Sequence, residues 1–227
     1  MIESIDFPIR INRYLELKGV ATRRGADELI ERGLVFVNGQ KAVLGYQVKE
    51  SDQVEVSETD LASRQEKYIY LAFNKPKGLA TEDIKINGVF PLGRLDKESE
   101  GLILLTNDGR VTDRLLNPKY GQEKEYLVEV REKVSPMHKK ILEGGVTSQD
   151  EKLKAKNVEI INQHNLAIIL TEGQKHEIRR MLNSARLTVV NLKRARVMNV
   201  KLGNLALSKS RPLVGAELKN FLTDLGL

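Results

Sequence analysis

Hydrophobic residues near the start of the chain recur at helical spacing and predict two short helices. Ile11, Tyr14 and Leu15 mark the first helix, and the same spacing returns between residues 26 and 30. Thr22 precedes the second run at the position where a hydroxyl side chain caps a helix. The segment from residue 10 to Gly33 is therefore expected to form a helix pair.

Short strands are predicted after this helix pair. Residues 34–37 and 41–43 are mostly apolar, and Asn38-Gly39 between them is a strong signal for a two-residue hairpin turn. Residues 53–56 alternate apolar and polar positions and predict a further strand. Beyond residue 57 the sequence turns polar and loses its periodicity, so we place a domain boundary near residue 62.

The remaining sequence alternates predicted strands and helices without a repeat. Strands are expected at 68–74, 102–105, 125–130, 158–161 and 166–170, and helices at 111–116, 136–142 and 177–185. Short turns, rather than helical crossovers, join the strand pairs, which favours antiparallel pairing. The sequence thus predicts an α+β protein with a small domain at 1–62 and a larger domain at 63–227, built on a mainly antiparallel mixed sheet with flanking helices.

Composition narrows the class of protein. The chain has 227 residues, of which 41% are hydrophobic, enough for a substantial core. It has no cysteine, which excludes a disulfide framework, and no apolar run approaches the roughly 20 residues that a membrane helix needs. With no visible export signal, we expect a cytoplasmic protein without a membrane role.

Positive charge is concentrated in one stretch. The chain carries a net charge of +6, and residues 173–196 alone carry the same net charge, because their single acid, Glu177, faces seven lysines and arginines. A concentrated basic segment is typical of proteins that bind a phosphate backbone, although a solvated basic helix is an equally common explanation.

Several familiar sites are excluded by their missing residues. The chain has neither a phosphate-binding Gly-x-x-x-x-Gly-Lys-Ser/Thr loop nor a Gly-x-Gly-x-x-Gly motif after a strand. His176-Glu177 begins like a zinc-protease helix, but Arg180 replaces the second histidine. We therefore expect no metal, and the three histidines are too few and too separated for a histidine-rich site or a serine triad.

Asp96 is the strongest candidate for chemistry. In an extended chain Arg94 and Asp96 project to one side while Leu95 projects to the other, so a cation lies beside the carboxylate. Taken alone, such a pair is more often structural than catalytic.

The motifs around Asp96 resemble those of a known family. Residues 93–96 (Gly-Arg-Leu-Asp), 99–102 (Ser-Glu-Gly-Leu) and 105–109 (Leu-Thr-Asn-Asp-Gly) resemble the catalytic signature of the RsuA/RluB/RluF-type ribosomal RNA pseudouridine synthases. Three further matches follow that family's order, at 75–78 (Lys-Pro-Lys-Gly), 124–126 (Lys-Glu-Tyr) and 178–181 (Ile-Arg-Arg-Met). The first domain is similar to the alpha-L (S4-like) RNA-binding domain.

The resemblance implies roles for three residues. Asp96 would be the essential carboxylate, acting as a nucleophile or as a base that assists glycosidic cleavage. Arg179 would keep Asp96 ionised and aimed, because a guanidinium offsets the desolvation of a carboxylate beside a stacked base. Tyr126 would stack against the uracil and accept a proton from its carbon.

Other basic residues are predicted to bind RNA. By resemblance Arg94 would fill the space that the flipped base leaves. The further candidates for phosphate contacts are Lys75, Lys77, Arg180, Lys193, Arg194 and Arg196 in the larger domain, and Arg13, Arg23 and Arg24 in the smaller one. Because the first 60 residues hold more acids than bases, RNA binding there would depend on one face of the helix pair.

The predicted function is an RNA pseudouridine synthase that isomerises a specific uridine in ribosomal RNA, most simply of the large subunit. Such an isomerisation implies no metal and no organic cofactor, and we expect a monomer. Two alternatives stay open: an enzyme that acts on transfer RNA or on both RNAs, and a non-catalytic RNA-binding factor for ribosome assembly. A pure RNA-binding protein would have no reason to keep Asp96, Tyr126 and Arg179 together.

Overall fold

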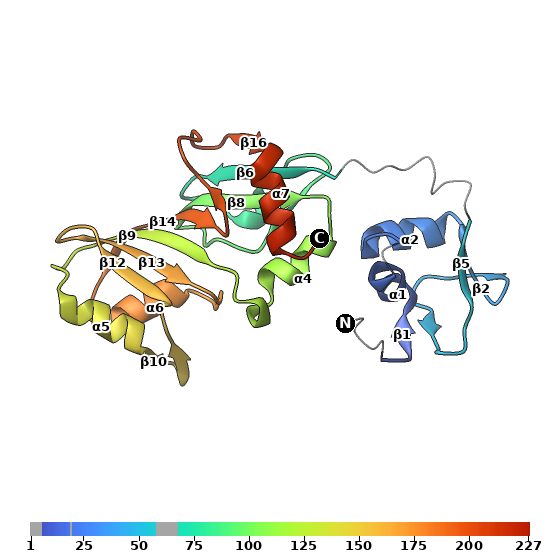
Figure 1. Cartoon of the computed structure of the whole chain (residues 1–227), viewed down its shortest axis with the longest axis horizontal. Coiled ribbons are helices and arrows are strands. Elements are labelled where there is room, and N and C mark those ends of the chain that lie inside the picture. Colours follow the sequence, from blue (N-terminus) through green and yellow to red (C-terminus); the bar gives the residue numbers. More distant parts are fainter. Residues whose placement is uncertain (1–5, 19, 58–67) are drawn as a thin grey trace. The chain divides into compact units, whose positions relative to one another are not determined.

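The computed structural model describes residues 6–18, 20–57 and 68–227 and divides the chain into two compact units (Figure 1). One unit comprises Met1–Tyr68 with Asp108–Arg110, and the other comprises Ile69–Asn107 with Val111–Leu227. The predicted boundary near residue 62 lies outside the described residues. Within the described ranges, no helix has the length and apolar character needed to cross a bilayer.

The first unit packs two helices against short strands. Its elements are β1 (Ile9–Arg10), α1 (Ile11–Leu17), α2 (Arg23–Glu31), β2 (Val35–Val37), β3 (Gln40–Lys41), β4 (Gln47–Val48) and β5 (Val54–Val56). Strands β3, β2 and β5 form a small antiparallel sheet in that order, and β1 pairs with β4. Ile11, Leu15, Leu29 and Ile30 are buried in its core, as their helical spacing predicts.

Local signals in the sequence explain where these elements begin and turn. The Thr22 hydroxyl accepts a hydrogen bond from the Gly25 amide at 3.1 Å and so caps α2. Asn38 and Gly39 both have positive φ, 51° and 77°, which the tight hairpin between β2 and β3 requires. The predicted cap and hairpin are confirmed.

The second unit contains one large sheet and its covering helices. Its elements are β6 (Tyr70–Lys75), η1 (Thr81–Asp83), β7 (Phe90–Leu92), β8 (Glu100–Thr106), α4 (Arg110–Leu116), η2 (Pro118–Tyr120), β9 (Lys124–Val130), α5 (Pro136–Gly144), β10 (Val146–Ser148), β11 (Glu151–Leu153), β12 (Asn157–Ile160), β13 (Asn165–Leu170), α6 (Glu177–Ser184), β14 (Val189–Val197), β15 (Val200–Lys201), β16 (Ser210–Pro212) and α7 (Gly215–Asp224). Every strand and helix predicted for this region is present, with bounds shifted by one or two residues.

The sheet follows the order β12-β13-β9-β14-β8-β6-β16, with β15 added to β14 and β7 added to β8. All of its strand pairs are antiparallel except β14 and β8, which run parallel at the centre. This confirms the predicted α+β class and mainly antiparallel mixed sheet. The sequence pattern did not predict β7, β10, β11, β15, β16 or α7, because these segments are short or weakly periodic.

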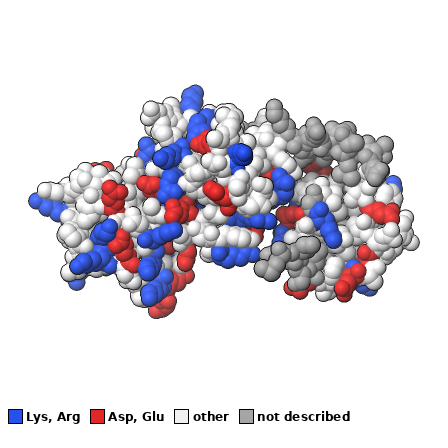
Figure 2. Space-filling view, viewed as in Figure 1, with Lys and Arg blue, Asp and Glu red and all other residues white. Residues whose placement is uncertain are grey.

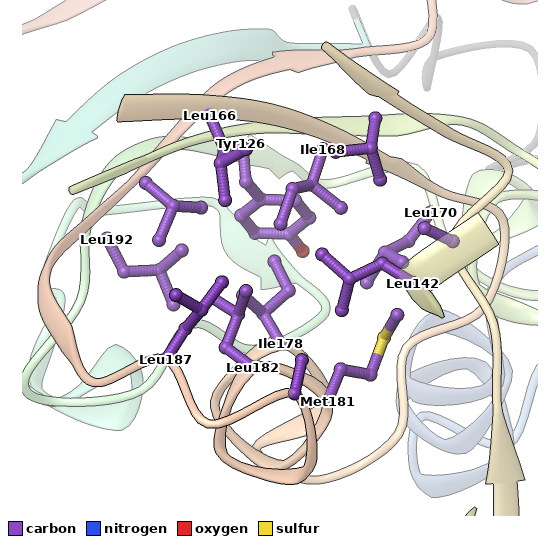
Figure 3. Packing of buried hydrophobic residues seen from close by; sticks show 14 of the residues in the cluster. Tyr126, Leu142, Leu166, Ile168, Leu170, Ile178, Met181, Leu182, Leu187 and Leu192 are labelled. Atoms are coloured by element: carbon purple, nitrogen blue, oxygen red, sulfur yellow. The ribbon is translucent and has the colours of Figure 1, made fainter. Parts of the chain in front are cut away.

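Two hydrophobic clusters hold the sheet and the helices together. One joins β9 and β13 to α5 and α6 and includes Leu142, Leu166, Ile168, Met181 and Leu182 (Figure 3). The other joins β6 and β8 to α4 and α7, where Phe221 of α7 is buried and its ring packs at a steep angle to that of Tyr70. The parallel contact between β14 and β8 therefore lies where the two halves of the unit meet.

Gly101 makes this central contact possible. Its φ is +107°, and a Cβ atom there would collide with the carbonyl oxygen of Arg194 and lie 2.8 Å from the Arg194 nitrogen. A side chain would thus push the two central strands apart.

A Gly101→Ala substitution is expected to lower the free energy of unfolding by about 3 kcal/mol or more, from steric overlap and backbone strain combined. Gly203→Ala is the matched control, because Gly203 also has positive φ, +56°, but a Cβ atom would meet nothing within 4 Å. Chemical denaturation of both variants measures the difference. Equal losses would show that the close approach to Arg194 costs nothing.

Candidate active site

Asp96 lies in the loop that joins β7 to β8. Gly93, with φ 77°, starts the loop, and Leu95 is buried against the core. The side chains of Arg94 and Asp96 are instead 85% and 35% exposed, so the alternation expected of an extended segment is present although the loop is not a strand. The expected pairing of Arg94 with Asp96 is not seen, since Arg94 approaches Glu82 at 4.0 Å.

A cleft of about 700 Å³ opens beside Asp96. Its walls come from η1, the 93–99 loop, the start of β9, the segment 173–179 and the middle of β14. Asp96, Tyr126 and Arg179, which are far apart in the sequence, all line it. A cleft of this size is typical of sites for small organic groups and has room for a nucleotide.

Tyr126 forms part of the inner wall of the cleft. It is 8% exposed, and its ring lies among Leu166, Ile168 and Ile178 of the core (Figure 3). Because these side chains fix the ring, Tyr126 offers the cleft a rigid aromatic surface with a polar hydroxyl.

Among the residues that the structure describes, His176 rather than Arg179 forms an ion-pair contact with the Asp96 carboxylate. His176 Nε2 lies 3.5 Å from Asp96 Oδ1. His176 directly precedes α6 in a left-handed backbone conformation, with φ 53°, so it lies at the N-terminus of this helix.

Arg179 instead contacts the turn that follows Asp96. Its Nη2 donates to the carbonyl of Glu98 at 3.2 Å and lies 3.5 Å from the Ser99 hydroxyl. The predicted direct ion pair between Arg179 and Asp96 is therefore not formed in this structure. The reason is that the turn presents the Glu98 carbonyl to the guanidinium, so Arg179 secures the loop that carries Asp96.

Three further charged residues line the cleft and are almost fully buried: Lys124, Glu177 and Arg194. Burial lowers the pKa of Lys124, and the positive charge of Arg194 lowers this pKa further. Burial raises the pKa of Glu177, although the Gln174 amide donates to its carboxylate at 3.0 Å and opposes the rise. This part of the cleft is thus largely shielded from water. A polar or anionic ligand group there would lie near two basic side chains, Lys124 and Arg194, and one acidic side chain, Glu177.

Comparison with known proteins decides the family. The model of the RNA pseudouridylate synthase family matches residues 69–184, which contain Asp96, Tyr126 and Arg179, and the S4 domain model matches residues 9–54. The chain belongs to the RNA pseudouridylate synthase family. It is therefore an RNA-modifying isomerase, and the alternative of a non-catalytic assembly factor is set aside.

Relatives of this synthase cover nearly all of it. It is 36% identical over 226 residues to the dual-specificity RNA pseudouridine synthase RluF of Escherichia coli K12, covering 94% of this chain and 78% of that protein. It is 33% identical to the ribosomal large subunit pseudouridine synthase B of Bacillus subtilis, covering 92% and 94%. A crystal structure of a pseudouridylate synthase superposes with a TM-score of 0.68 at 26% identity, covering 94% of this chain and 99% of that one. The resemblance drawn from the motifs is confirmed.

Lys75 is not exposed to solvent, as a residue that contacts RNA must be. The side chain is fully buried, and its ammonium donates to the carbonyls of Pro76 at 3.0 Å, Leu79 at 2.6 Å and Lys97 at 3.4 Å. Burial lowers the pKa of Lys75. The predicted phosphate contact is wrong for Lys75 in this structure, because the turn after β6 folds back over its ammonium group.

Three arginines of the basic segment are also turned inward. Arg194 is 4% exposed and donates to the Leu102 carbonyl at 2.6 Å. Arg196 is paired with Glu123 and Glu125 at 3.1 and 2.7 Å, and Arg180 with Glu151 at 2.6 Å. Sequence alone counts these charges as a groove for phosphates, but the fold gives each one a partner within the protein, which argues against the predicted RNA contacts.

The remaining predicted RNA contacts differ in their exposure and in whether an acid pairs with them. Lys77 and Arg24 are exposed, Lys193 is half-buried, and Arg13 and Arg23 both pair with Glu16. On the face shown in Figure 2, lysines and arginines are interspersed with acids rather than gathered in one patch. Phosphate binding would therefore depend on the remaining exposed cations, not on the whole basic segment.

The sequence reasoning missed His176 and Thr81 as parts of the site. His176 attracted attention only as half of a failed zinc motif, and its position just before α6 was the available signal. Thr81 lines the cleft from η1, a short element that no periodicity predicts. Both reach Asp96 or its neighbours through tertiary contacts alone.

Proposed function

We propose that this synthase converts a specific uridine of large-subunit ribosomal RNA to pseudouridine, with Asp96 as the essential carboxylate. The observation that carries the proposal is the place of Asp96, on a clamped loop at a nucleotide-sized cleft whose inner wall is an aromatic ring. The name of the Bacillus subtilis relative supports the large subunit as the source of the substrate.

The geometry supports a division of labour between the three site residues. The target uridine must leave its stack to reach the cleft, which costs a few kcal/mol. The Asp96 carboxylate then assists cleavage of the bond between the uracil nitrogen and the ribose, and the freed base turns to present its carbon to the same ribose atom. Tyr126 holds the base against its ring. Its hydroxyl takes up the proton that this carbon loses while it gives its own proton to the uracil nitrogen that the cleavage freed.

Arg179 would support the chemical step, whereas the exposed cations would act earlier, when the RNA binds. Arg179 donates a hydrogen bond to the Glu98 carbonyl and keeps a positive charge near the place where negative charge develops during the reaction. Arg94 is exposed at the rim of the cleft, where it can enter the gap that the flipped uridine leaves. Lys77, Lys193 and the α1–α2 face of the first unit would position the RNA backbone without reading its sequence.

A second candidate function is activity on transfer RNA as well. The Escherichia coli relative is named a dual-specificity enzyme, which favours testing both RNAs. We further propose that the enzyme acts in the cytoplasm and as a monomer. The monomer is supported by the residues assigned to the chemistry, which all belong to one unit of one chain.

The decisive experiment maps pseudouridines at nucleotide resolution in total RNA from cells with and without the protein. One large-subunit uridine is expected to lose its modification, and the purified protein is expected to restore it on the extracted RNA. Loss confined to transfer RNA would select the second candidate. Unchanged modification in every RNA, together with no activity in vitro, would refute the proposed function.

A further inference from the structure

The Asp96 carboxylate has little direct support from other side chains. It is about one-third exposed, and its ionisable neighbour His176 is 3.5 Å away, beyond a good hydrogen bond. The direction of this carboxylate must therefore be set mainly by the backbone of the 93–99 loop. Whatever holds that backbone decides where the reactive oxygen lies.

One buried side chain holds the residue just before Asp96 from both sides. The Thr81 hydroxyl donates to the Leu95 carbonyl at 2.8 Å and accepts a hydrogen bond from the Leu95 amide at 3.0 Å. Thr81 is 4% exposed, so water does not compete effectively for either bond. The two bonds fix both peptide planes of Leu95, and the second of these planes also contains the Asp96 nitrogen.

The residues after Asp96 are held by different groups. The Lys97 carbonyl accepts from the Gly78 amide at 2.8 Å and from the Lys75 ammonium at 3.4 Å. The Asp96 carbonyl accepts from the Ser99 amide at 2.9 Å. These bonds close the turn on its far side. On its near side Thr81 makes two hydrogen bonds to Leu95, and Arg194 adds a longer one to the Arg94 carbonyl at 3.4 Å.

We propose that Thr81 is a positioning residue for the isomerisation: its hydroxyl clamps the Leu95 backbone and thereby aims the carboxylate of Asp96 into the cleft. The inference deepens the proposed function and rests on the catalytic role assigned there to Asp96. Thr81 itself makes no bond in the reaction. Its loss acts on the rate because displacing a reactive group by about 1 Å can cost on the order of 100-fold.

Thr81→Val tests the proposal, since valine keeps the shape of threonine and removes the hydroxyl. We expect kcat on the target RNA to fall by about 10- to 100-fold while KM stays within about 3-fold, because the RNA-binding surface is unchanged. Thr188→Val is the control: the Thr188 hydroxyl also makes a hydrogen bond, to the Glu132 carboxylate at 2.8 Å, but Thr188 does not line the cleft and lies outside the motifs assigned to the chemistry. A control with the same loss in kcat would overturn the proposal.

A second pair of variants serves if the valine enzyme does not fold. Thr81→Ser loses the methyl group and keeps the hydroxyl, and Thr81→Cys loses the same methyl group but carries a thiol, a weak hydrogen-bonding group, in place of the hydroxyl. The serine enzyme is expected to keep kcat within about 3-fold of wild type and the cysteine enzyme to lose about 10-fold. Equal kcat values for these two enzymes would overturn the role of Thr81. Wild-type enzyme that is itself inactive on every RNA would instead refute the proposed function, so the two failures are distinguishable.

Discussion

An Asp96→Asn enzyme is expected to form no detectable pseudouridine, a loss of at least about 10⁴-fold in kcat, while it binds the target RNA within about two-fold of wild type. Asparagine keeps the size of the side chain but removes the negative oxygen that attacks or assists cleavage. Stability should hardly change, because the Asp96 side chain is 35% exposed and its contact with His176 is long, at 3.5 Å, and solvent-accessible. Single-turnover assays with excess enzyme measure the chemical step directly.

Asp224→Asn is the matched control for this substitution. Asp224 is exposed at the end of α7 and does not line the cleft, so the same chemical change there should leave activity intact. Turnover above about 1% of wild type by Asp96→Asn would contradict the role of Asp96, since loss of an essential group leaves far less. A loss of RNA affinity equal to the loss of activity would show that Asp96 serves binding.

The second large effect is expected for Arg179→Ala. Removing the guanidinium frees the Glu98 carbonyl, loosens the turn after Asp96 and removes positive charge from the cleft, so kcat should fall by about 100-fold with RNA affinity within about 3-fold. Arg179→Lys should recover only part of the rate, because an ammonium keeps the charge but not the planar guanidinium geometry that brings Nη2 to the Glu98 carbonyl. Steady-state kinetics on the mapped RNA measure the change in kcat, and a separate binding assay measures the change in RNA affinity.

Arg131→Ala removes the same charge from an exposed site just after β9 and should leave kcat unchanged. The assignment of Arg179 fails if its alanine variant loses affinity in proportion to kcat/KM, because that result describes a phosphate contact. It also fails if Arg179→Lys is as active as wild type, which would show that the guanidinium geometry is not needed.

Particular elements show why the fold was predictable. The Asn38-Gly39 hairpin, the Thr22 cap and the short turn between β12 and β13 each depend on a few neighbouring residues. Their physics is local, and the printed sequence contains all of it. The parallel contact of β14 with β8 was not predictable in the same way, since it joins segments about ninety residues apart and requires Gly101 to admit the Arg194 backbone.

The candidate active site likewise has a part that the sequence predicts and a part that it does not. The motifs placed Asp96, Tyr126 and Arg179 together as candidates, and the fold brings all three to one cleft. The partners of the charged groups could not be predicted, because an ion pair depends on distances between side chains that the sequence does not contain. Lys75 and Arg194 look like RNA contacts until the fold buries them against backbone carbonyls.

The sequence by itself determined the two-domain α+β organisation, the family and the candidate carboxylate, because periodicity, turn chemistry and motif order are properties of neighbouring residues. Only the tertiary structure decided that His176 stands beside Asp96, that Arg179 secures the Glu98 carbonyl and that Thr81 clamps Leu95. Each of these contacts joins residues brought together by packing of the sheet, its loops and α6, and hydrogen bonds form or fail over differences of less than 1 Å.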